Sequence, residues 1–164
     1  MRFSFLLFLV LCALTLQTTA FNFLVIHGVK PDLVLVLVIL NGFLRGPREG
    51  AFYGFAAGAI QDLALGGIFG LHTLTKMVAA ILAGLGKDHL YRDNRIIAVF
   101  LTWVCTFVAQ LIFYLLLLLV EIPVPFLSAL NNVIIPSAFY NAVIALLIYG
   151  YFYRIYKKES LSYI

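Results

Sequence analysis

The sequence predicts an all-α integral membrane protein, a single domain over residues 1–164 that folds as a bundle of six transmembrane helices. Hydrophobic residues make up 64% of the chain and charged residues only 11%, and the mean hydropathy is +1.08. Soluble proteins carry roughly a quarter charged residues, so this chain has too much apolar surface for a soluble domain. Six apolar runs are separated by short links, and the basic residues gather in alternate links.

The first apolar run covers residues 3–20 and follows the basic residue Arg2. A basic start, an apolar centre and the small residues Thr18 and Ala20 would also suit a cleaved signal peptide. We expect a retained first transmembrane helix.

The second and third helices are expected over residues 31–44 and 50–63. Pro31 suits the first turn of a helix, and the acidic Asp32 there meets the positive end of the helix dipole. Fourteen residues span only about 21 Å, against about 30 Å of hydrocarbon, so a re-entrant hairpin is the alternative. Basic residues such as Arg45 lie in the link between the two helices, which favours a cytoplasmic turn and two full spans.

Three further spans are expected at 70–86, 95–120 and 133–153, which places both termini in the cytoplasm. Of the eleven basic residues, Lys30 then lies outside and Lys76 lies within a helix. The other nine fall on the cytoplasmic side, as the positive-inside rule requires. They are Arg2, Arg45, Arg48, Lys87, Arg92, Arg95, Arg154, Lys157 and Lys158.

Glycines recur every fourth residue around the third span. They occupy positions 46, 50, 54, 58, 66 and 70, and the gap at 62 holds an aspartate. In lipid, small residues that let backbones approach are the usual basis of helix association. We therefore expect a close helix contact, within the chain or with another membrane protein, at Gly50, Gly54, Gly58, Gly66 and Gly70.

Among the polar residues within the expected spans, four stand out as candidates for a functional role: Gln61, Asp62, His72 and Lys76. Unpaired charges there are costly and are rarely left without a partner. His72 and Lys76 are four apart and share a helix face. We expect Asp62 to reach one of them in a salt bridge or hydrogen bond that joins the third and fourth helices. A partner-facing or ligand-facing polar site is the alternative, and ion conduction a third.

Pro136 and Asn141 are the unusual residues of the last span. Proline removes a backbone donor and leaves a carbonyl free, which kinks a helix unless a neighbour bonds to that carbonyl. Asn141 either takes this local role, as we expect, or bonds to another helix.

The sequence carries no pattern typical of catalysis or of metal or cofactor binding, and no enzyme is predicted. It has no GxSxG, HExxH or P-loop motif, and its three histidines are widely separated. Cys12 and Cys105 lie in apolar runs without a CxxC pattern. The basic residues form no stripe with aromatics between them, so nucleic-acid binding is not indicated either.

Residues 30–75 carry a series of short motifs. A Pro-Asp pair opens the second span, a Gly-x3-Gly-x3-Asp core fills the third, and a Leu-Gly step leads into the fourth. These positions are Pro31, Asp32, Gly54, Gly58, Asp62, Leu63, Gly66 and Gly70. The series resembles the rod shape-determining MreD family, as do the chain length, the pair Gln17-Thr18, and Pro136 with Asn141.

The resemblance implies a non-enzymatic, multi-pass scaffold of the bacterial inner (cytoplasmic) membrane, in the machinery of cell elongation. Proteins like MreD bind MreC and help to connect MreB filaments to a SEDS-type transglycosylase and its transpeptidase, so maintaining rod shape. The glycines and the polar residues Gln61, Asp62, His72 and Lys76 would then form the contact with MreC. The same surface would also permit the protein to form a homo-oligomer. The family is related in fold to the S components of energy-coupling-factor transporters. A vitamin-binding S component, with Asp62, His72 and Lys76 around a pocket open to the outside, is therefore the alternative function.

Overall fold

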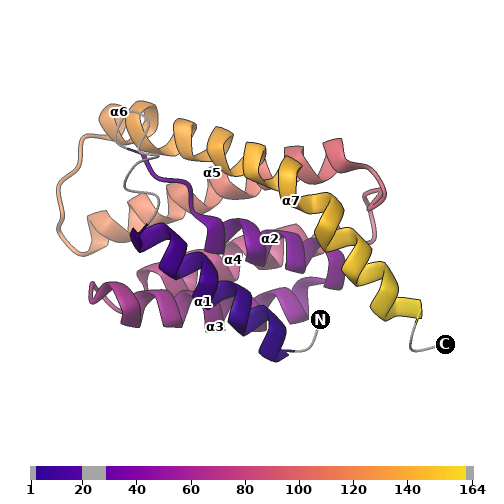
Figure 1. The fold of residues 1–164 in the computed structure, drawn as a ribbon. Helices are drawn as coiled ribbons and strands as arrows, with labels where there is room; N and C mark the ends of the chain where they lie inside the picture. The colour runs from indigo at the N-terminus through magenta and orange to yellow at the C-terminus, as the bar shows by residue number, and fades with distance from the viewer. Residues whose placement is uncertain (1–2, 20–28, 162–164) are drawn as a thin grey trace.

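The computed structural model describes residues 3–19 and 29–161, and helices make up 83% of it. Arg2 and Ala20, at the ends of the first expected span, lie outside the described residues. The elements are α1 (Phe3–Thr19), α2 (Leu33–Arg45), α3 (Pro47–Leu65), α4 (Leu71–Leu85), α5 (Arg95–Leu119), α6 (Phe126–Ala129), the π-helix η1 (Leu130–Ile134) and α7 (Ile135–Leu161). Because α6, η1 and α7 follow one another without a break, these elements form six helical rods (Figure 1).

Helix ends coincide with residues suited to them. Asp32 is the N-cap of α2, and its side chain accepts a hydrogen bond from the backbone N–H of Leu35. Pro47 follows Gly46 and occupies the first turn of α3. Gly66 ends α3 in the left-handed conformation, with φ 65°, which glycine adopts without strain. The third helix therefore has 19 residues instead of the expected 14, or about 28 Å.

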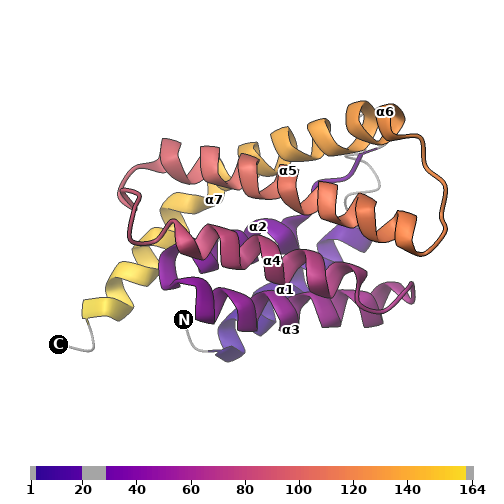
Figure 2. The ribbon, with the colours of Figure 1, turned by 180° about the vertical axis from the view of Figure 1, so that it is seen from behind.

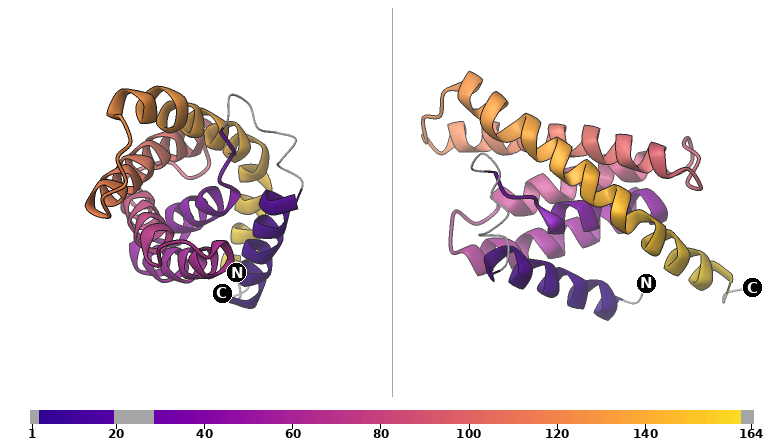
Figure 3. Two further views of the ribbon diagram at one scale, coloured as in Figure 1. Left: turned by 90° about the vertical axis from the view of Figure 1, so that its left-hand side faces the viewer. Right: turned by 45° about the horizontal axis from the view of Figure 1, so that its top comes forward.

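Helix α2 lies at the centre of the bundle (Figure 3). All of its residues from Val34 to Leu44 are buried, and it contacts α1, α3, α4, α5 and α7. A helix that is apolar on every side is typically buried on every side. At 13 residues it is also about 20 Å long, shorter than the hydrocarbon core, and the other helices surround it.

Two helix pairs cover α2. Helices α3 and α4 form an antiparallel hairpin along one side, and α5 packs against α7 along another (Figure 2). The first residues of α1 and the last turn of α7 lie at the same end of the molecule (Figure 1). The end with the α3–α4 turn is opposite.

The last rod begins at Phe126, seven residues before the expected start at Val133, because Pro125 serves as its N-cap. It passes Pro136 without a break. The N–H of Ile135 bonds to the carbonyl of Leu130, in the wide turn of a π-helix that directly precedes the proline.

Two rods in the described part of the chain are long and apolar enough to cross a membrane. They are α5, with 25 residues, and the stretch Phe126–Lys158, with 33 residues. Helices α2 and α4, and residues Leu7–Thr19 of α1, are apolar but shorter. These apolar helices suggest a membrane protein.

Candidate functional site

Asp32 connects α2 to three other helices. Its carboxylate accepts hydrogen bonds from Lys76 Nζ of α4 at 2.6 Å and from Gln17 Nε2 of α1 at 3.3 Å. Its backbone N–H donates to Asn141 Oδ1 of α7 at 3.0 Å. We call Asp32, Gln17, Lys76 and Asn141 the Asp32 network. Because each member comes from a different helix, the network fixes four helices relative to one another.

The pairing of Lys76 corrects the sequence-based expectation. Asp62 was expected to reach His72 or Lys76. It reaches His72 only through the backbone N–H, and Lys76 instead forms its salt bridge with Asp32, which is 44 residues away in sequence. The lysine side chain is only 1% exposed and that of Asp32 is 17% exposed. Breaking a pair this deeply buried would leave one charge uncompensated, so the two charges must be kept or removed together.

The role expected for Asn141 was also wrong. Its side chain does not serve the carbonyl freed by Pro136, since Oδ1 accepts from Asp32 and Nδ2 lies 3.4 Å from Thr106 Oγ1 of α5. Asn141 is fully buried. The amide therefore joins helices, as in the alternative that the sequence left open.

Asp62 binds the start of α4. Its two carboxylate oxygens accept from the backbone N–H groups of Gly70 at 2.9 Å, His72 at 3.0 Å and Thr73 at 3.0 Å, and from Thr73 Oγ1 at 2.6 Å. The first N–H groups of a helix have no partner within the helix and favour a negative charge. Asp62 thus links α3 to α4 through backbone N–H groups and the hydroxyl of Thr73, and not through the side chains of His72 or Lys76.

Three of the predicted glycines face α4. A Cβ on Gly54 would lie 2.7 Å from the carbonyl oxygen of Lys76, and a Cβ on Gly58 would lie 2.5 Å from the Cα of Thr73. Gly50 is in the same position one turn earlier. The backbones of α3 and α4 therefore touch, and no outside helix can occupy this stripe.

Sequence reasoning missed two glycines that extend this contact. Gly42 of α2 lies against the backbone of Ala80, and Gly84 of α4 lies against Pro47 at the start of α3. By contrast, a Cβ on Gly66 or Gly70 would meet nothing within 4 Å. Both of these have a positive φ, so they shape the α3–α4 turn instead of packing.

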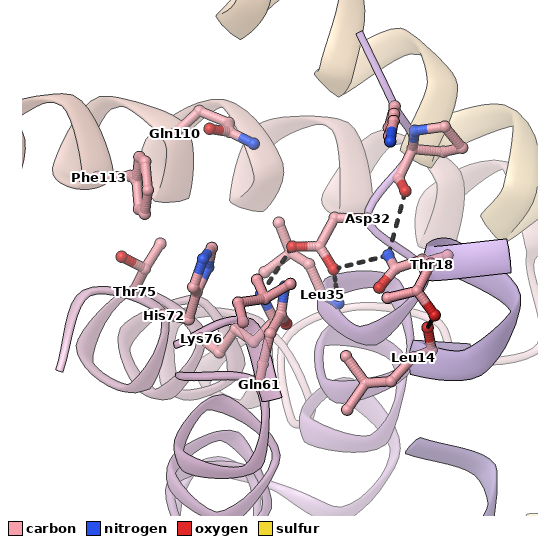
Figure 4. A pocket seen from close by; sticks show the side chains of 14 residues that line it. Leu14, Thr18, Asp32, Leu35, Gln61, His72, Thr75, Lys76, Gln110 and Phe113 are labelled. Atoms are coloured by element: carbon pink, nitrogen blue, oxygen red, sulfur yellow. Dashed lines mark hydrogen bonds and ion pairs between the residues drawn. The ribbon is translucent and has the colours of Figure 1, made fainter. Parts of the chain in front are cut away.

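A cavity of about 420 Å³, here called the polar cavity, lies where α1, α3, α4 and α5 surround the start of α2 (Figure 4). Five of the expected site residues line it, whereas Asp62 does not. Those five are Pro31, Asp32, Gln61, His72 and Lys76.

Several lining residues were not singled out as site residues from the sequence, among them Gln17, Gln110 and Phe113. The ring of Phe113 stacks on that of His72, with centroids 5.1 Å apart. Gln110 is the one amide side chain in the apolar α5. A lone amide in a strongly apolar helix is a signal that could have drawn attention to it.

A family model described as rod shape-determining protein MreD matches residues 1–159 of the chain. No curated protein and no solved structure matched the chain, so the likeness to S components stays a prediction. Because the family match spans nearly the whole of the 164 residues, the chain belongs to the MreD family of rod shape-determining proteins.

Proposed function

We propose that this protein is a non-enzymatic scaffold of the bacterial inner membrane that binds MreC and helps to link MreB filaments to the peptidoglycan synthases. Membership of the MreD family supports a role in rod shape determination, within the MreBCD shape system. The match over residues 1–159 is the single observation that carries the proposal.

The positions of the links support a six-span topology with both termini in the cytoplasm. Lys87 of the α4–α5 link donates to the carbonyl of Arg45 at the end of α2. Arg92 of the same link bonds to the hydroxyl of Tyr156, near the end of α7. Three basic segments therefore meet at one end of the bundle, the end expected to face the cytoplasm.

The α3–α4 turn is the part of the predicted partner site that remains available. Gly50, Gly54 and Gly58 are covered by α4, but Gly66 and Gly70 enclose a turn whose Phe69 is 62% exposed and Ile68 42% exposed. Two adjacent exposed apolar side chains at the end of a bundle form a surface that can meet lipid or a partner. We propose that MreC contacts this turn on the outer side of the membrane.

Co-expression with MreC, followed by affinity purification from detergent, tests both the binding of MreC and the contact at the α3–α4 turn. Phe69→Asn should lower the recovery of MreC, because it removes an exposed aromatic anchor. Tyr91→Asn is the matched control, since Tyr91 is 81% exposed in the α4–α5 link at the opposite end. Wild-type protein that recovers no MreC would overturn the scaffold, whereas equal recovery with both variants would move the contact away from the turn.

A further inference from the structure

The polar cavity has the size and composition of a small-molecule site. Its volume of about 420 Å³ falls in the range of ligand pockets. Apolar side chains such as Leu14, Leu35 and Leu65 form much of the wall, and polar side chains from several helices face one another across it. A mostly apolar wall with a few convergent polar groups is typical of sites that orient a small ligand.

The charges deepest in the wall already neutralise each other. Lys76 and Asp32 form a salt bridge at 2.6 Å, and Asp32 also accepts from Gln17 and from the backbone of Leu35. An ionic ligand would have to compete with this pair for its counter-charge. Lys30 also lines the cavity, but it is exposed and not part of the buried floor. The floor of the cavity therefore favours an uncharged ligand.

The amides provide the groups that such a ligand would need. Gln61 of α3 is 6% exposed, and its Oε1 has no hydrogen-bond partner among the described residues. A buried carbonyl without a donor is unusual and is free to accept a hydrogen bond from water or from a ligand in the cavity. Gln110 reaches in from α5 on the opposite side (Figure 4). Side-chain amides both donate and accept, which matches the two edges of another amide.

The wall beside the amides is flat and aromatic. Phe113 and His72 stack with ring centroids 5.1 Å apart, and both line the cavity next to Thr75. A planar ring packs well against such a surface. We infer that the polar cavity binds a small, uncharged molecule that combines a planar ring with an amide or lactam group, held by Gln61 and Gln110.

Three ring compounds of the same shape separate this class from charged ligands. Benzamide is a neutral amide, benzoate an anion and benzamidine a cation. The full-length protein in lipid nanodiscs should bind benzamide more tightly than the other two in calorimetric titrations. Gln61→Leu should weaken benzamide binding about tenfold, the loss expected for one buried hydrogen bond.

Two further variants keep the test decisive. Gln110→Leu replaces a part-exposed side chain and serves if Gln61→Leu does not fold. Asn132→Leu is the matched control, because it removes an exposed amide outside the cavity, bonded to Ser128, and it should leave binding unchanged. Tighter binding of benzoate or benzamidine would overturn the inferred class. The absence of binding by all three compounds, or equal benzamide binding by all variants, would overturn the site.

Discussion

The α3–α4 contact and the Asp32 network join helices by opposite means. At the contact, Gly54 and Gly58 bring the two backbones together because no side chain separates them. In the network, the long side chains of Lys76 and Gln17 extend from α4 and α1 to the start of α2 and meet one carboxylate. The α3–α4 contact depends on the absence of side chains, whereas the Asp32 network depends on the polar side chains that form it.

This difference predicts different sensitivities to substitution. Close backbone contact in lipid is stabilised by packing, so it is damaged by added atoms. A buried ion pair is damaged when one partner is lost, because the remaining charge has no water to solvate it. Four predictions test the comparison.

Lys76→Met should have the largest effect. It leaves the Asp32 carboxylate buried without its counter-charge, which costs about 3–5 kcal/mol. The melting temperature of the detergent-purified protein measures the loss. The double variant Asp32→Asn with Lys76→Met removes both charges and should recover much of the stability. A double variant as unstable as the single one would show that the ion pair is not the source.

Asp62→Leu should rank second. It removes the acceptor for the N–H groups of Gly70, His72 and Thr73 and leaves them unsatisfied, with a loss of at least about 2 kcal/mol in the same melting experiment. Asp62→Asn keeps one acceptor oxygen and should lose less. Unchanged melting combined with lost recovery of MreC would instead assign Asp62 to the partner.

Gly58→Ala should cost about 1–3 kcal/mol, because the new methyl group would push α4 away at Thr73. Gly67→Ala is the matched control, since a Cβ there meets nothing within 4 Å and its φ is not positive. Thermal melts of the two variants provide the comparison. Equal melting temperatures would contradict direct backbone contact between α3 and α4.

Gln17→Leu should have the smallest effect. Gln17 Nε2 donates to Asp32 Oδ1 and to the carbonyl of Pro31, and these are part-buried bonds. Their loss should cost about 1 kcal/mol and should loosen α1 without unfolding the rest. Hydrogen exchange of the α1 backbone, followed by mass spectrometry, should increase in α1 and stay unchanged in α4.

Much of the helical architecture follows from local features of the sequence. Apolar runs, Asp32 at a helix start and glycine before and after the α3–α4 turn all act within a few residues, so their effects can be read along the chain. The start of the last rod differs because Pro125 was assigned to a link, although proline suits the residue before a helix as well.

Pairings between residues far apart in the sequence could not be predicted from the sequence. Asp62 was expected to meet His72 or Lys76 because one short turn separates these residues in sequence, whereas the actual partner of Lys76, Asp32, is 44 residues away from it. Lys76 also lies one turn beyond Thr73, and a turn is about 5.4 Å, so Asp62 reaches the first turn of α4 and not the second. Asn141 and Asp32 are 109 residues apart, a pairing that sequence periodicity does not encode.

The composition of the Asp32 network also bears on how the protein is made. The ribosome synthesises Gln17 and Asp32 early, Lys76 later and Asn141 last, so the carboxylate is made before its counter-charge. The network is complete only when α7 has been made. A chain that stops before Asn141 would therefore lack the contact that joins the start of α2 to α7.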